Sequence, residues 1–231
     1  MMTPARLREI EFKFVVADKK AFHQLVEHLR LSASVLDHGV NQTNHFFDSR
    51  TFCLRQSHFA IRLRQEGTNH ILTLKAEQQP DSSEIAVLTD RIEQEAELPH
   101  ETAQALLQGM DTPQQVIRRY FEDSSSAPLQ FIQSACGDQE LIHIGEFVNH
   151  RIRLPRVRIP VGEYWETIEF ELDTSTFPNG RIDHELEIEI SEHSDAAAME
   201  AALIELFEQA GIDWYSAPSK AERFFNALAA G

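Results

Sequence analysis

Charged residues occupy alternate positions in several short segments of the chain, and in most of them the neighbouring charges have the same sign. In HELEIEI, residues 184–190, three glutamates (Glu185, Glu187 and Glu189) alternate with leucine and isoleucine. A period of two is typical of a β-strand with one apolar and one polar face. Carboxylates on one face repel each other unless an opposite charge lies between them. Because hard divalent cations prefer carboxylate oxygens, we interpret this strand as one side of a metal site.

Basic residues alternate in the same way on other predicted strands. The cations are Arg62, Arg64 and Lys75 in HFAIRLRQEG and NHILTLKAE, and Arg151 and Arg153 in HRIRL. Such a row can bind an anion with several charges, for example a chain of phosphates. Three further segments carry acidic or mixed faces: Glu9, Glu11 and Lys13; Arg91, Glu93 and Glu95; and Glu169, Glu171 and Asp173.

Six strands with such faces favour a closed sheet. If the faces pointed to water, serine, threonine and glutamine should be common among the charges. The strands can instead curl into a barrel with charged faces inward and apolar faces covered by helices. We therefore predict an α+β fold, an eight-stranded antiparallel β-barrel with a charged interior, as one domain over residues 1–231. The alternative is an exposed sheet joined by cross-strand ion pairs.

Local patterns predict the elements that position these faces. Asp18 is a suitable N-cap for one helix, Thr112 and Pro113 begin another, and Gly211 is suited to end a third. In SKAER, Lys220 and Arg223 share one face of a C-terminal helix. The predicted strands are 7–17, 41–49, the hairpin 58–77, 86–98, 141–159, 164–173 and 182–191. The predicted helices are 19–31, 100–109, 112–122, 195–210 and 217–229, and residues 122–128 are a predicted loop.

Composition limits the classes of function. The chain of 231 residues has 21 Lys and Arg against 37 Asp and Glu, for a net charge of −16, which argues against non-specific binding of nucleic acid. We expect no membrane partner, because no run of about 18 apolar residues is present and the N-terminus lacks the apolar region of a signal peptide. Cys53 and Cys136 have no metal-binding or redox spacing, so we expect reduced thiols and a cytoplasmic protein. A monomer and a homodimer both remain open.

Taken in order, the charged motifs resemble those of CYTH proteins, the triphosphate tunnel metalloenzymes. Glu9-x-Glu11-x-Lys13 resembles the ExExK signature of the family. Five further motifs follow in the order found in the family: HFFDS, AIRLRQE, LTLK, RIEQEAEL and HRIR. The C-terminal elements of the family resemble FELD, HELEIEI and SKAER. The pair ELEIE and SKAER resembles bacterial inorganic triphosphatases in particular. The chain departs from the family in having Phe46 and Phe47 where tyrosine is common, and in its longer insert at 111–140.

The resemblance implies a tunnel that binds a triphosphate together with Mg²⁺ or Mn²⁺. It implies that the phosphates are bound by Lys13, Arg62, Arg64, Lys75, Arg151, Arg153, Lys220 and Arg223. The implied metal ligands are Glu9, Glu11, Glu185, Glu187, Glu189, Glu169 and Asp173. Glu9, Glu11, Lys13 and Lys75 are the implied catalytic residues.

We therefore predict metal-dependent hydrolysis of a triphosphate, with inorganic triphosphate as the preferred substrate and phosphate and diphosphate as products. One cation and the basic residues would neutralise the phosphate chain, and a second cation would orient and acidify the attacking water. Thiamine triphosphate and nucleoside triphosphates are alternative substrates. A class IV adenylate cyclase is a second possible enzyme, although no adenine pocket can be identified. A non-catalytic polyphosphate-binding module is the third alternative.

Overall fold

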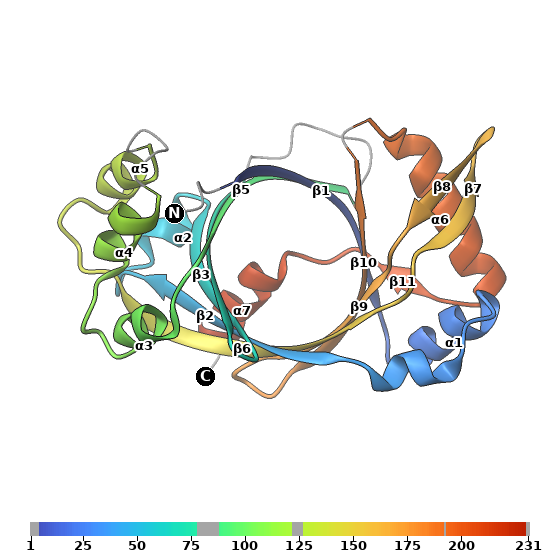
Figure 1. Ribbon diagram of the computed structural model, residues 1–231, viewed down its shortest axis with the longest axis horizontal. Helices are drawn as coiled ribbons and strands as arrows, with labels where there is room; N and C mark the ends of the chain where they lie inside the picture. Colours follow the sequence, from blue (N-terminus) through green and yellow to red (C-terminus); the bar gives the residue numbers. More distant parts are fainter. Residues whose placement is uncertain (1–4, 78–87, 122–126, 192, 230–231) are drawn as a thin grey trace.

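The computed structural model describes residues 5–77, 88–121, 127–191 and 193–229 (Figure 1). Within these ranges, the side chains of residues 5–9, 76–77, 88–93 and 127 lie outside the described set. The fold consists of a ring of antiparallel strands with helices packed on two opposite sides of it (Figure 1). No helix in the described ranges is long and apolar enough to span a membrane.

Eight strands form the ring, because β1 pairs with β5 on one side and with β10 on the other. The order around it is β1, β5, β4, β3, β2, β6, β9, β10 and back to β1, with every pair antiparallel. The strands are β1 (Ala5–Val16), β2 (Val40–Asp48), β3 (Phe59–Glu66), β4 (Asn69–Glu77), β5 (Leu88–Glu97), β6 (Ile142–Arg153), β9 (Glu171–Thr176) and β10 (Ile182–Ile190). The short β11 (Trp214–Tyr215) adds to β1, and β7 (Val157–Val161) with β8 (Tyr164–Ile168) forms a separate hairpin. The predicted eight-stranded barrel is confirmed.

Period-two alternation separates the two faces of the ring. On β1, Phe12 and Phe14 are fully buried on the outer face, while Glu11 and Lys13 line the interior. Strand register continues this separation, since Lys13 lies opposite Glu187 and Phe14 opposite Leu186. Each strand therefore contributes apolar side chains to an outer core and polar side chains to the interior.

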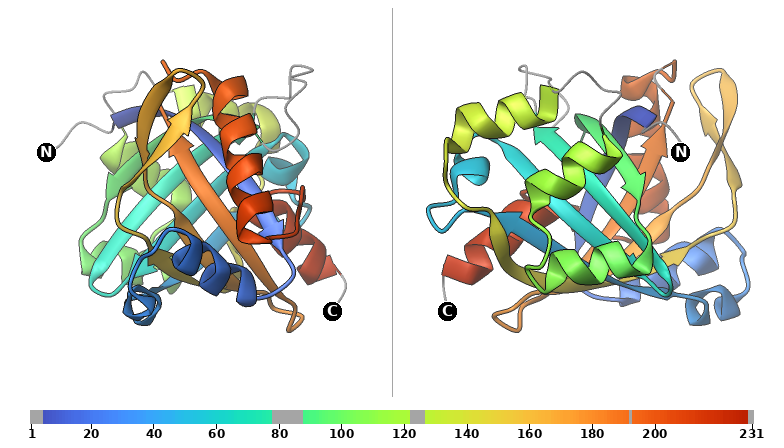
Figure 2. Two further views of the ribbon diagram at one scale, coloured as in Figure 1. Left: turned by 90° about the vertical axis from the view of Figure 1, so that its right-hand side faces the viewer. Right: turned by 60° about the vertical axis from the view of Figure 1, so that its left-hand side comes forward.

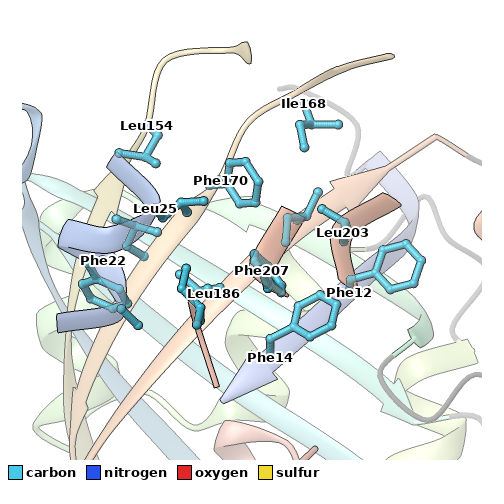
Figure 3. Close-up of a cluster of buried hydrophobic side chains, with 14 of the residues drawn as sticks. Phe12, Phe14, Phe22, Leu25, Leu154, Ile168, Phe170, Leu186, Leu203 and Phe207 are labelled. Atoms are coloured by element: carbon cyan, nitrogen blue, oxygen red, sulfur yellow. The ribbon is translucent and has the colours of Figure 1, made fainter. Parts of the chain in front are cut away.

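One outer core lies between the β1, β9 and β10 side of the ring and two helices, α1 (Lys20–His28) and α6 (Ala196–Ala210) (Figure 1). Figure 3 shows its side chains, among them Phe14 and Phe207, whose rings meet edge to face at 4.8 Å. Each large apolar side chain buried in this way contributes about 1.5–3 kcal/mol to stability. As predicted, α6 ends at Gly211, which is left-handed (φ 67°) and caps the helix.

A second outer core covers β3 and β4 on the opposite side (Figure 2). Its helices are α2 (Cys53–Gln56), α3 (His100–Leu107), α4 (Pro113–Tyr120) and α5 (Ala127–Cys136). Thr112 and Gln115 form a capping box at the predicted start of α4. The Asp48 carboxylate of the HFFDS motif accepts hydrogen bonds from the backbone N–H groups of Ser49, Leu54 and Arg55, so this acid holds the start of α2.

The last helix, α7 (Lys220–Ala229), packs against the ring near β6. Figure 1 shows it through the opening of the ring. Its Phe224 ring stacks on Phe46 of β2, with ring centroids 4.7 Å apart, and also contacts Phe147 of β6 at 6.0 Å. Because Phe46, Phe147 and Lys220 all line the interior cavity, α7 forms part of the cavity wall.

Several element boundaries differ from the predictions. The stretch predicted as one strand over 141–159 is β6 and β7, and the one predicted over 164–173 is β8 and the start of β9. Pro155 lacks a backbone N–H and follows β6, which favours a break there. The 3₁₀ helix η1 (Ala33–Asp37) and α5 were not predicted. Of the predicted loop 122–128, residues 122–126 lie outside the described residues.

The two cysteines form a disulfide that joins α2 to α5, with Cα atoms 5.3 Å apart and a sequence separation of 83. The prediction of reduced thiols is therefore wrong. The placement of α5, a helix that was not predicted from the sequence, brings Cys136 beside Cys53. Closing a loop of this length in the unfolded chain stabilises the folded protein by about 4 kcal/mol in the chain-entropy account.

Candidate active site

The ring encloses a cavity of about 290 Å³ whose lining is dominated by charged side chains. The predicted site residues that line it are Glu11, Lys13, Arg62, Arg64, Lys75, Arg151, Arg153, Glu187, Glu189 and Lys220. They come from β1, β3, β4, β6, β10 and α7. Side chains that are far apart in sequence therefore face one interior, as the alternation predicted.

We call the interior faces of β1, β9 and β10 the acidic wall, defined by Glu11, Glu171, Glu187 and Glu189. On it, Glu11 lies directly opposite Glu189 in the β1–β10 register. The Lys13 Nζ atom lies 2.6 Å from Glu11 Oε1 and 3.4 Å from Glu187 Oε1. A cation thus lies between like charges, which is the arrangement that repulsion along the strand requires.

Glu187 is the most heavily paired carboxylate of this wall. Its oxygens lie 2.6 Å from Arg151 Nη2 and 2.8 Å from Lys220 Nζ. Burial by itself would raise the pKa of Glu187, but Lys220, Lys13 and Arg151 together lower this pKa well below its ordinary value. Glu187 is therefore ionised throughout the physiological range.

Asp173 lies behind the acidic wall and organises its cations. It is almost fully buried, accepts a 2.8 Å hydrogen bond from Arg151 Nε, and lies 2.6 Å from Lys220 Nζ. Burial raises its pKa, whereas Lys220 and Arg151 lower it, and the net direction is down. Burial lowers the pKa of Lys220, but the carboxylates of Asp173, Glu185 and Glu187 raise it. The net effect is a raised pKa.

Arg223 and Glu185 form a second buried pair beside this one, also outside the cavity lining. Arg223 Nη2 lies 2.6 Å from Glu185 Oε2, and Arg223 Nη1 lies 2.6 Å from Asp183 Oδ2. Arg223 of α7 thus pairs with two carboxylates of β10, Asp183 and Glu185. The SKAER motif therefore contributes one cation to the cavity, Lys220, and one that attaches the helix to the ring, Arg223.

The basic wall consists of Arg62 and Arg64 on β3 and Lys75 on β4, which face the cavity from the other side. Glu95 of β5 lies 3.8 Å from both arginines. The Nε atoms of Arg62 and Arg64 are buried and have no hydrogen-bond partner among the described residues. Burial and the neighbouring Arg62 lower the pKa of Arg64. An anion between these groups would provide the missing acceptors.

Some cavity residues were not in the predicted site. Glu171 lines the cavity and pairs with both Arg151 and Arg153, and burial raises its pKa despite Arg151. The alternation of FELD did place Glu171 beside Asp173, so this residue was within reach. The uncharged lining residues Gln42, Asn44 and Asn149 carried no such signal. Asn149 donates to Gln42 and accepts from Ser175, which forms an amide network on β2, β6 and β9.

Three predicted metal ligands are absent from the described cavity lining: Asp173 and Glu185, which are buried beside it, and Glu169. Glu169 precedes β9, is 43% exposed and has Arg156 as its nearest cation, at 4.0 Å. Glu169 is absent from the cavity lining, although the alternation continues across the gap between β8 and β9, where Ile168 and Phe170 both stay buried in the outer core. Its role as a metal ligand stays a prediction. Glu9 lies on β1 opposite Arg91 in the β5 register, but its side chain lies outside the described residues.

The donor set of the acidic wall fits Mg²⁺ or Mn²⁺, because all of its candidate ligands are carboxylate oxygens. Among the described side chains, no three of these carboxylates offer oxygens within 4.8 Å of one another. This spacing still suits Mg²⁺, which is commonly held by one or two carboxylates together with waters and substrate phosphates. Glu11, Glu187 and Glu189 are the residues that would hold such an ion.

A closed strand ring with one acidic and one basic inner wall is the fold and site that this chain shares with one protein family. The family model for the CYTH domain matches residues 7–225. The chain belongs to the CYTH domain family. The resemblance read from the charged motifs is confirmed at this level.

Individual relatives cover the chain unevenly. The "Putative triphosphatase YjbK" of Bacillus subtilis (strain 168) is 37% identical over 67 residues, which are 29% of this chain and 33% of that protein. The match thus spans about a third of the curated relative. HpAC1 from Hippeastrum, named "Putative adenylyl cyclase" and described as having a dominant triphosphatase activity, has a TM-score of 0.71 at 22% identity. The match covers 94% of this chain and 95% of that protein. A Bacillus halodurans protein named "putative adenylate cyclase" has a TM-score of 0.66 at 23% identity, over 95% of this chain and 98% of that protein. At these identities the two structures establish the fold.

Proposed function

We propose that this protein is a metal-dependent triphosphatase whose substrate is inorganic triphosphate. The observation that carries the proposal is the pair of buried arginine Nε donors without acceptors, Arg62 and Arg64, facing a wall of carboxylates across a cavity of about 290 Å³. A linear polyanion with a bound cation satisfies both walls at once. The names of YjbK and HpAC1 support the same class of reaction.

In this proposal the chain's own residues mainly fix charge. Arg62, Arg64 and Lys75 bind the phosphate chain, and Lys13, Arg151 and Lys220 bind phosphate oxygens while they hold Glu187 in place. When bound, Mg²⁺ or Mn²⁺ at Glu11, Glu187 and Glu189 neutralises phosphate charge and makes a coordinated water more acidic. Phosphoryl transfer depends on such positioning and charge stabilisation.

Glu171 is our candidate for the acceptor of the proton from the attacking water. Burial raises its pKa, so it holds a proton more firmly than an ordinary glutamate. The water attacks the terminal phosphorus, its proton passes to the Glu171 carboxylate, and the bridging P–O bond breaks to release diphosphate. Catalytic roles for Glu9, Glu11, Lys13 and Lys75 remain predictions alongside this one.

Hydrolysis fits the cavity better than cyclisation of ATP. A cyclase needs a pocket for adenine, whereas the only aromatic side chains of the described lining are Phe46 and Phe147, and both pack against α7. A cytoplasmic location stays a prediction, and the Cys53–Cys136 disulfide removes the argument from reduced thiols that supported it.

The test is a substrate comparison with purified protein in Mg²⁺ and in Mn²⁺. We expect release of phosphate from inorganic triphosphate, at a higher kcat/KM than from ATP or thiamine triphosphate. Formation of diphosphate and cyclic AMP from ATP would instead establish a cyclase. Tight binding of triphosphate without any product would establish a binding module and overturn the proposal.

A further inference from the structure

Outside the tunnel, three metal-ligand side chains meet on the outer face of β2 and β6. The Nδ1 atom of His45 lies 3.2 Å from Nε2 of His143 and 2.9 Å from Oε2 of Glu146. The three residues each offer one ligand atom, and these three atoms all lie within 4.8 Å of one another. No histidine lines the cavity among the described residues, so this cluster is separate from the candidate active site.

A break in strand register creates the cluster. His45 pairs with Glu146 and Phe47 pairs with His143, and the register shifts between Phe46 and Phe47. In a regular strand, residues 143 and 146 would point to opposite faces. The bulge turns His143 to the outer face beside Glu146, and re-aiming a side chain is a common use of a β-bulge.

Gly145 allows this bulge to form. Its φ of +142° is one that other residues rarely adopt, and an added Cβ would lie 3.3 Å from Phe224 of α7. The geometry of the three ligands is thus supported from the opposite side of the strand by the packing of α7. The bulge that brings the three ligands together is therefore part of the packed fold.

Hydrogen bonds alone do not pair all the polar atoms of this cluster, because His45 Nδ1 lies close to both His143 Nε2 and Glu146 Oε2. A single hydrogen on His45 Nδ1 would have to serve both the imidazole nitrogen of His143 and the carboxylate of Glu146. Burial lowers the pKa of His45, and His143 and His70 lower it further against the opposing effect of Glu146. Burial also lowers the pKa of His143. Neutral imidazole is the form that binds metals.

The distances suit a small cation. Ligand nitrogens at about 2.0–2.1 Å from a tetrahedral zinc ion are about 3.3 Å apart, close to the separation of the two histidine nitrogens. His45 is 7% exposed and so is fixed in the wall, whereas Glu146 has a side chain that is 50% exposed. An ion could therefore enter from solvent and keep a water as its fourth ligand. Two imidazoles and one carboxylate favour Zn²⁺ or Co²⁺ over Mg²⁺ and Mn²⁺.

We propose that His45, His143 and Glu146 form a transition-metal site of the zinc class on the outer wall of the barrel. The bound ion joins β2 to β6 directly behind the strand segment whose Asn44 and Phe46 line the cavity. The Nε2 atom of His45 is buried without a hydrogen bond of good geometry, although the Gln65 side chain is close enough to raise the pKa of the ring.

Titration of the full chain with Co²⁺, in saturating Mg²⁺, tests the site through visible absorption. We expect one equivalent of Co²⁺ with the intense bands of a tetrahedral ion with nitrogen ligands, displaced by Zn²⁺. His143→Gln and Glu146→Gln should each weaken Co²⁺ binding at least about tenfold, and both change exposed side chains and so preserve the fold. His23→Gln, on α1, is the matched control and should bind as the wild type does.

Glu187→Gln separates this inference from the proposed function. It removes a carboxylate of the acidic wall and should leave the Co²⁺ spectrum and stoichiometry unchanged. Absence of the tetrahedral bands in the wild type would overturn the inference, and so would wild-type binding by His143→Gln. Loss of binding in Glu187→Gln alone would place the ion in the tunnel instead.

Discussion

The two inner walls of the barrel carry similar numbers of charges but hold them in different ways. On the acidic wall, Glu187 is in contact with Lys13, Arg151 and Lys220, and the cluster is almost neutralised from within. On the basic wall, Arg62 and Arg64 share one acidic neighbour at 3.8 Å and retain buried donors without acceptors. Most charges of the first wall are paired within the folded protein, whereas the second retains buried donors that a ligand can pair.

This difference separates stability from binding. Removing a partner from a buried ion pair leaves an uncompensated charge and costs about 3–5 kcal/mol. Arg62 has weaker internal partners, a 3.3 Å hydrogen bond to Thr73 and Glu95 at 3.8 Å, and its Nε has no acceptor. Its removal should therefore reduce the stability of the protein little and the binding of the ligand strongly. Substitutions on the acidic wall should therefore change folding and catalysis together, while those on the basic wall should change mainly the use of substrate.

The largest effect is expected for Glu187→Gln. Loss of this carboxylate removes a candidate metal ligand and the common partner of three cations, so triphosphatase activity should fall by about 10²–10³-fold or more. Initial rates in Mg²⁺ and Mn²⁺ measure the change. Glu163→Gln, at the exposed β7–β8 turn, is the control. Wild-type turnover in the Glu187 variant would remove this residue from the site.

Arg62→Ala should lower kcat/KM for triphosphate by about 10–100-fold, because a charge-assisted hydrogen bond contributes about 1.5–3 kcal/mol. The free energy of unfolding without ligand should change by less than about 1 kcal/mol. Steady-state kinetics and urea unfolding give the two quantities. Arg158→Ala, on the separate hairpin, is the matched control. A large loss of stability with unchanged kinetics would show that the two walls do not differ as described.

Asp173→Asn should lower the free energy of unfolding by about 3 kcal/mol at pH 7, because Arg151 and Lys220 lose a buried partner. The pKa of Asp173 is lower in the folded protein than its ordinary value of 3.8. Its stabilising effect is therefore fully present above about pH 3.8 and is lost as the pH falls through the folded pKa. Urea unfolding at several pH values should show the cost of the substitution shrinking below this point, and Asp213→Asn should show no cost. A cost that does not depend on pH would contradict the assignment.

The smallest effect on activity is expected on the outside of the basic wall. Joint replacement of Cys53 and Cys136 by serine should lower the free energy of unfolding by about 2–4 kcal/mol and change kcat/KM less than twofold. The disulfide joins α2 to α5 and touches neither wall. Thermal unfolding and kinetics of the same preparation measure both. A tenfold loss of kcat/KM would show that the outer core positions the basic wall.

The residues that line the interior could be predicted from the sequence, because the alternation of side chains along a strand is a local property. Period two alone places Glu11 and Lys13 on one face and Phe12 and Phe14 on the other, and the register of β1 with β10 follows from matching those faces. Ordered motifs then linked the strands to a family. Both steps use information contained in single short segments.

The remaining features depend on contacts between distant segments. Glu169 and Glu171 follow one alternating pattern, but only Glu171 lines the cavity, and the side chain of Glu169 is exposed. Gln42 and Asn149 are ordinary residues until β2 and β6 bring their amides together. The outward turn of His143 depends on a bulge that the local pattern does not reveal.

Closure of the ring also bears on how the protein behaves at high concentration. Each of the eight described ring strands has a hydrogen-bonded neighbour on both sides, which leaves no unpaired edge there to recruit another chain. The two-stranded β7–β8 sheet, in contrast, has two outer edges and carries Trp165, which is largely exposed. Pro160 interrupts the donors of one edge, and Glu166 and Arg158 add charge to the hairpin. Resistance to aggregation in this molecule therefore depends on a few residues of one hairpin.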